Sequence, residues 1–180
     1  VIQKMVAHPD KLVAAQTRYA SEFGNLWHQY LESLSGKGPK LEPIKDRRFS
    51  DETWTSNPWF DFMARSYLLT AQHMQNAVAS VDGVSPQTRH KALYYTRQML
   101  DAAAPSNFAL TNPQVLKATA DSGGENLVKG LKNMLRDIEK GKGGLRIAMT
   151  DTSAFEMGKN VASTPGKVVF QNDLMQLLQY

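Results

Sequence analysis

Apolar residues recur at intervals of three, four and seven positions along much of the chain, which is the spacing of an α-helix with one buried face. The first such run predicts a helix over 9–35, with Pro9 in its first turn and Gly36 beyond its end. Its apolar stripe comprises Leu12, Tyr19, Phe23, Leu26, Trp27, Tyr30, Leu31 and Leu34. A stripe this long needs a partner surface, because water would otherwise cover it.

Residues 36–48 (GKGPKLEPIKDRR) contain two glycines and two prolines among basic residues, a composition typical of a linker. Three more helices are expected after it, each opened by a polar capping residue and a proline. The pairs are Asn57–Pro58 (with Ser56 as the alternative cap), Ser85–Pro86 and Asn112–Pro113. The first is expected to end at Asp82–Gly83, the second near Ala103, and the third at the glycines at positions 141, 143 and 144, after an interruption at Gly123–Gly124.

The last part of the chain changes to short β-prone runs at 167–170 and 174–180, separated by Gln171–Asn172–Asp173. This spacing predicts a β-hairpin. Two strands alone are marginally stable and have unpaired edges, so we expect them to belong to a larger sheet outside this chain. The fold prediction is mainly α, with four to five helices and a short C-terminal β-hairpin. Three parts are expected: a helix with its linker (1–48), a helical domain (49–150) and the hairpin (151–180).

Composition narrows the function classes. Hydrophobic residues make up 42% of the chain and charged residues 21%, as in globular proteins. The absence of cysteine excludes disulfides, zinc–thiolate sites and a cysteine nucleophile, and fits a reducing compartment. The chain has no apolar run long enough for a transmembrane helix and no signal peptide in its first ten residues. It also lacks an initiator methionine, which suggests a piece of a longer protein.

No group of residues has the spacing of a catalytic or metal site. The four histidines, His8, His28, His73 and His90, lie far apart and have no ligand spacing, so a structural or surface role is the better interpretation. No nucleophile elbow or phosphate-binding loop occurs. We therefore expect no catalytic residue, no metal and no cofactor in this chain.

One predicted helix is strongly basic on one side. Lys129, Lys132, Arg136 and Lys140 are spaced three, four and four residues apart and share a face. With Lys142 and Arg146, and against only two acidic residues, they give the stretch 129–146 the whole net charge of +4. The favoured interpretation is the solvated face of a core helix, and the alternative is contact with an anionic surface such as acidic lipid. Nucleic acid is not expected, because the patch has no interleaved aromatic residues and no groove-reading motif.

The aromatic residues Trp54, Trp59, Phe60, Phe62 and Tyr67 form a second candidate. Their spacing is typical of a core, but neighbouring positions point in several directions around a helix. Some of them are therefore candidates for contact with a partner. Three aromatic residues of the first helix are added as interaction candidates, because its long apolar face can pair with a partner helix: Phe23, Trp27 and Tyr30.

Four strings in a fixed order point to a family. They are FSDETWTSNPWFDFMARSYLL, PSNFALTNP, SGGENLVKGLKNMLRDI and TDTSAFEMGKNVASTPGKVVFQNDLMQLLQY. Over residues 49–180 the chain closely resembles the N-terminal region of class I polyhydroxyalkanoate synthases, acyltransferases that polymerise 3-hydroxyacyl-CoA thioesters into storage polyester with release of CoA. Residues 1–48 resemble it less distinctively.

The resemblance implies that the chemistry belongs to a following α/β-hydrolase-like domain with a cysteine nucleophile, and that the hairpin leads into that domain. No catalytic residue can be transferred to this chain. The resemblance further implies a cytoplasmic, granule-associated location and roles in dimerisation, in stabilising the active enzyme, and in contact with the granule surface and granule-associated proteins. The rival hypothesis is a stand-alone helical adaptor that binds granules, membranes or proteins.

Overall fold

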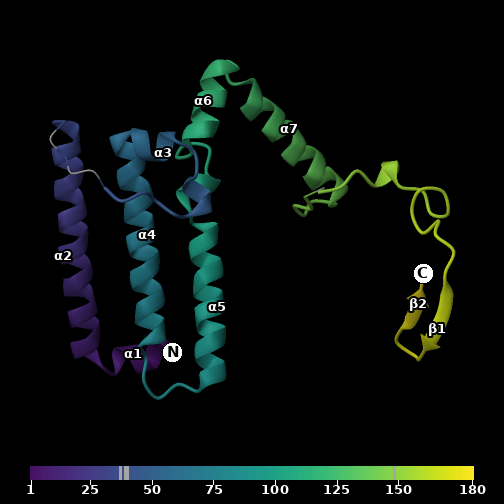
Figure 1. The fold of residues 1–180 in the computed structure, drawn as a ribbon, viewed down its shortest axis with the longest axis horizontal. Helices are drawn as coiled ribbons and strands as arrows, with labels where there is room; N and C mark the ends of the chain where they lie inside the picture. Colours follow the sequence, from purple (N-terminus) through teal and green to yellow (C-terminus); the bar gives the residue numbers. More distant parts are fainter. Residues whose placement is uncertain (37, 39–40, 148) are drawn as a thin grey trace. The chain divides into compact units, whose positions relative to one another are not determined.

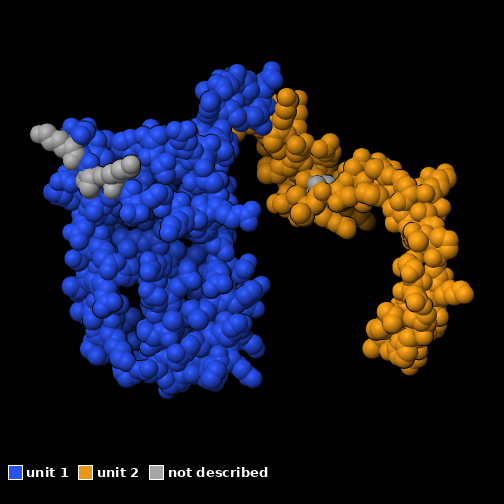
Figure 2. Space-filling model, in the orientation of Figure 1, with its two compact units in different colours: residues 1–126 blue, residues 127–180 orange. Residues whose placement is uncertain are grey.

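The computed structural model describes residues 1–36, 38, 41–147 and 149–180. These residues form two compact units, 1–126 and 127–180, coloured separately in Figure 2. The helices are α1 (Ile2–Val6), α2 (Pro9–Leu34), α3 (Thr53–Ser56), α4 (Pro58–Ala79), α5 (Pro86–Ala102), α6 (Pro113–Asp121) and α7 (Glu125–Lys140), and the strands are β1 (Lys167–Gln171) and β2 (Gln176–Gln179). The mainly helical fold with a C-terminal hairpin is thus confirmed.

In the first unit, α4 lies between α2 and α5 (Figure 1), and it packs against both. The core lies beside α4, where Phe49, Trp54 and Ala64 are buried. Ala64 is fully buried on α4, and its small side chain leaves room for the two rings. The helix expected at 9–35 therefore packs against the rest of the unit through α4, although its sequence allowed it either to pack or to extend away.

Three helices begin as expected, with a polar capping residue followed by a proline as the first helical residue. The Asn57 side chain accepts hydrogen bonds from the backbone N–H groups of Trp59 (3.0 Å) and Phe60 (3.4 Å), with Pro58 in the first turn. Ser85 and Asn112 cap α5 and α6 in the same manner. Each cap satisfies donors that the helix itself cannot pair.

The interruption expected at Gly123–Gly124 is also present, between α6 and α7. Both glycines have positive φ angles, 58° and 89°, a conformation that residues with a side chain rarely adopt. The N–H of Gly124 donates to the carbonyl of Thr119 at 2.8 Å, which ends α6 with the bonding typical of a helix terminus.

The structure differs from the expected elements in three respects. The short helices α1 and α3 were not predicted, because neither is long enough to show helical periodicity. Residues 47–49, the end of the expected linker, form a turn of 3₁₀ helix, while residues 37 and 39–40 of that linker lie outside the described residues. The hairpin turn spans 172–175 rather than 171–173, because the Asn172 side chain accepts hydrogen bonds from the N–H groups of Leu174 and Met175, both at 2.9 Å.

Candidate interaction surfaces

The aromatic candidates of α2 and α4 form one cluster between the two helices, which we call the α2–α4 aromatic cluster. It consists of Phe23, Trp27, Tyr30, Trp59 and Phe62. Phe62 is at its centre: its ring centroid lies 4.9 Å from that of Tyr30, 5.3 Å from that of Trp27 and 6.0 Å from that of Phe23. Phe62 is buried, whereas Trp27 and Trp59 remain 44% and 49% exposed. Only the rims of this cluster are accessible to a partner.

The other aromatic candidates pack on the opposite side of α4. Trp54 is 1% exposed, and its ring lies 4.8 Å from Phe49 and 5.7 Å from Phe60. Tyr67 meets Phe49 at 5.8 Å. Edge-to-face contacts of this kind stabilise a core beyond the area they bury. Trp54 is therefore part of the core in the described structure and presents no surface for a partner.

Arg48 lies in the predicted linker, and its hydrogen bonds connect three segments of the chain. Its guanidinium donates to Asp46 Oδ2, to Tyr67 Oη and to Asp101 Oδ1, each at 2.7 Å. Tyr67 Oη in turn donates to the carbonyl oxygen of Leu100 at 2.9 Å. The hydrogen bond from Arg48 lowers the pKa of Asp46, and the same pairing raises the pKa of Arg48. The Asp-x-Arg spacing was the only sequence signal of this cluster.

Polar side chains also link α2 to α4. Glu22 Oε2 lies 2.7 Å from Nε2 of His73, whose ring meets Tyr19 edge-on at 5.2 Å. The hydroxyls of Tyr19 and Thr70 are hydrogen-bonded at 3.0 Å. These contacts give His73 the structural role favoured by the sequence. They also fix how α2 is rotated against α4, and so which of its residues face water.

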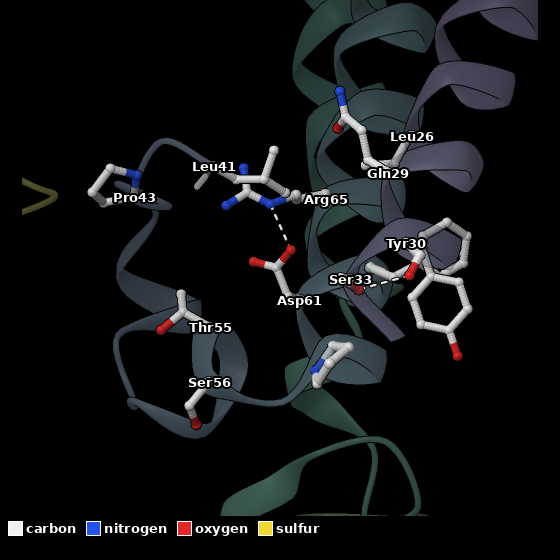
Figure 3. Close-up of a pocket in the computed structure, with 12 residues that line it drawn as sticks. Leu26, Gln29, Tyr30, Ser33, Leu41, Pro43, Thr55, Ser56, Asp61 and Arg65 are labelled. Carbon is white, nitrogen blue, oxygen red and sulfur yellow. Dashed lines mark hydrogen bonds and ion pairs between the residues drawn. The ribbon is translucent and has the colours of Figure 1, made fainter. Parts of the chain in front are cut away.

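A hollow of about 390 Å³ opens beside the start of α4 (Figure 3). Its charged groups are already paired: Arg65 Nε donates to Asp61 at 2.8 Å and Nη2 to the carbonyl of Glu42 at 2.7 Å. The hydroxyls of Ser33 and Thr55 donate to the backbone carbonyls of Tyr30 and Glu52, three residues earlier in each case. The residues that line the hollow include no histidine or cysteine, and the carboxylate that lines it, Asp61, is paired with Arg65.

The basic candidates Lys129, Lys132, Arg136 and Lys140 all lie on α7, in the second unit. The apolar residues on the other side of α7 are exposed rather than buried: Leu131 by 54% and Leu135 by 51%. The helix is thus not the core helix that the favoured interpretation assumed. At about 100° per residue, the centres of the basic and apolar faces lie on opposite sides of the helix axis, and Glu139 and Asp137 border the apolar face.

The described residues contain no group of three or more histidine, cysteine, aspartate or glutamate side chains that could hold a metal ion. Within the same ranges, no helix is long and apolar enough to cross a membrane.

Comparison with known proteins identifies the family. Residues 45–180 match the family described as "Poly-beta-hydroxybutyrate polymerase (PhaC) N-terminus". The chain belongs to this family. No solved structure matches the chain.

Named relatives agree with this assignment. The chain is 43% identical to a poly(3-hydroxyalkanoate) polymerase of Methylorubrum extorquens, which it matches over 100% of its own length and 30% of the relative's. It is 40% identical to the poly(3-hydroxyalkanoate) polymerase subunit PhaC of Cupriavidus necator, over 96% of the chain and 28% of that protein. The chain thus spans less than a third of these relatives, and corresponds to an N-terminal fragment of such a polymerase.

Proposed function

We propose that this chain is the non-catalytic N-terminal region of a polyhydroxyalkanoate synthase and that it supports the active enzyme by docking on the catalytic domain. The parent enzyme would polymerise 3-hydroxyacyl-CoA thioesters into polyester with release of CoA. The relatives are poly(3-hydroxyalkanoate) polymerases, which supports this reaction for the parent. Residues 1–48, 49–150 and 151–180 would then form the leading segment, the helical domain and the junction to the catalytic domain.

The observation that supports docking is the apolar surface of the second unit. None of its described residues is buried, and the hairpin residues Val169, Phe170 and Leu177 are each more than half exposed. Together with the apolar face of α7 they form more exposed apolar surface than a folded protein normally leaves in water. A neighbouring domain of the same enzyme would cover this surface at a lower cost in association entropy than a separate protein.

The basic face of α7 calls for a different occupant, because it points away from the apolar face. If the apolar face docks on the catalytic domain, Lys132, Arg136 and Lys140 project outward from the enzyme. We propose that they meet an anionic surface at the polyester granule or an acidic granule-associated protein. Self-association of the parent and a cytoplasmic, granule-bound location complete the proposal.

The test is to mix this chain with the separately produced catalytic domain of its parent, and to follow CoA release and the mass of the complex. We expect a stable complex and faster CoA release. The double variant Leu131→Gln, Leu135→Gln should weaken both effects, whereas Leu110→Gln, at a leucine that is 83% exposed in the first unit, should leave them unchanged. Absence of a complex with the unmodified chain would contradict the docking role and favour a stand-alone adaptor.

A further inference from the structure

A regular apolar ridge runs along α2 beside the face that packs against α4, and Trp27, at the border between the two, also contacts Phe62 of α4. Its residues repeat at alternating intervals of four and three, which is the seam spacing of paired helices. They are Val13, Thr17, Ala20, Gly24, Trp27, Leu31 and Leu34. We call them the α2 ridge. All seven are exposed, Val13 and Leu34 by 64% and 59%, and the ridge contains no charged residue whose burial would oppose pairing.

Large and small side chains are segregated along the ridge. Its second half contains Trp27, Leu31 and Leu34, and its first half contains smaller residues. A shallow hollow on α2 surrounds Ala20 and Gly24, between the rings of Tyr19 and Trp27. Apart from its two chain neighbours and the backbone of α2 itself, no atom lies within 4 Å of the position that a Cβ of Gly24 would occupy. The hollow is thus open to a side chain from outside.

From this arrangement we propose that the α2 ridge binds the α2 ridge of a second copy of this chain in antiparallel orientation. Alignment around Gly24 places Trp27 of each copy against Ala20 of the other, in the hollow. Val13 then meets Leu34, Thr17 meets Leu31, and Gly24 lies beside its own equivalent. One surface that fits itself is the requirement for a two-fold symmetric dimer.

The α2 ridge is also large enough to bind a second copy. The ridge is about 33 Å long, and covering it on both copies removes on the order of 1,000 Å² of accessible surface, the lower limit for a specific interface. Gly24 and Ala20 allow the two helix axes to approach closely. The proposal names the site for the self-association included in the proposed function, and its tests do not involve the catalytic domain, so the two can fail separately.

The first experiment measures mass against concentration for the full chain by analytical ultracentrifugation. We expect the mass to rise from one chain to two. Ala20→Glu should increase the dissociation constant at least about tenfold, the size typical of a residue at an interface centre. Ala14→Glu makes the same change on an exposed α2 residue outside the ridge and should leave the dissociation constant unchanged. A chain that stays monomeric, or equal effects of the two variants, would overturn the proposal.

The second experiment tests orientation and uses the absence of cysteine from the chain. A short bismaleimide should cross-link Gly24→Cys to itself. It should not cross-link Val13→Cys to itself, but should join Val13→Cys to Leu34→Cys when the two variants are mixed. Self-cross-linking of Val13→Cys without joining to Leu34→Cys would show parallel pairing and overturn the antiparallel arrangement. Circular dichroism of each variant checks that α2 remains folded.

Discussion

Phe60 and Phe62, two positions apart on α4, contact different neighbours: the ring of Phe62 lies 4.9 Å from Tyr30 of α2, and the ring of Phe60 lies 5.7 Å from Trp54 of α3. Residues two apart on a helix point to nearly opposite sides. Helix α4 therefore has an aromatic contact on two faces and joins α2 to the core around Phe49. The attachment of α2 depends on Phe62 more than on any other ring of the cluster.

Replacing Phe62 by alanine should therefore destabilise the first unit. Phe62 is 8% exposed, and truncating a buried phenylalanine costs about 3–5 kcal/mol of unfolding free energy. Trp59→Ala, at the half-exposed rim of the same cluster, should cost less. Urea unfolding followed by circular dichroism measures both. Equal losses for the two variants would contradict the central position of Phe62.

The cap of α4 makes a smaller contribution that can be isolated. Asn57→Ala removes the acceptor for the N–H groups of Trp59 and Phe60 and should cost about 1 kcal/mol of unfolding free energy. Asn57→Asp keeps the acceptor and adds a negative charge at the positive end of the helix dipole, so it should preserve stability. Urea unfolding of both variants separates the contribution of the capping hydrogen bonds from other effects of replacing Asn57. Equal losses of unfolding free energy in Asn57→Ala and Asn57→Asp would show that these hydrogen bonds contribute nothing.

The Asp46–Arg48 pair predicts how stability depends on pH. The pKa of Asp46 is lowered in the folded chain, mainly by the hydrogen bond from Arg48. The stabilisation is thus complete above the ordinary aspartate pKa of about 3.9 and is lost as the pH falls through the lower, folded value. Asp46→Asn should be less stable than the unmodified chain at pH 6, and this difference should shrink below pH 4. A difference that stays constant from pH 6 to pH 3 would contradict the pairing.

The helices that could be predicted from sequence are those with strong local signals. The pairs Asn57–Pro58, Ser85–Pro86 and Asn112–Pro113 marked three helix starts because capping depends only on neighbouring residues. The positive φ angles of Gly123 and Gly124 likewise follow from residue type. The bounds of the hairpin turn were predicted less accurately, because the hydrogen bonds of the Asn172 side chain place the turn one residue later at its start.

Contacts between distant segments could not be predicted in the same way. Arg48 lies in a Gly/Pro-rich segment, and only the fold brings Tyr67 and Asp101 within 2.7 Å of its guanidinium. The spacing of Phe60 and Phe62 indicated that both could not face one core, but not which helix each would meet. The exposure of the apolar side of α7 was also hidden, since amphipathic spacing is the same whether or not a partner covers it.

Two leucines test whether the apolar face of α7 is exposed in the isolated chain. Leu100 on α5 is 6% exposed and Leu131 on α7 is 54% exposed. Leu100→Ala should lower the unfolding free energy of the first unit by about 2–5 kcal/mol because it leaves a cavity. Leu131→Ala should change the unfolding free energy of the second unit by less than about 0.5 kcal/mol, as surface substitutions do. Trp27, Trp54 and Trp59 all lie in the first unit, so their fluorescence follows Leu100→Ala, whereas Leu131→Ala is followed by circular dichroism, which also reports the helix α7. Comparable losses for the two leucines would show that α7 is already covered without the catalytic domain, and its apolar face could not then be the docking surface.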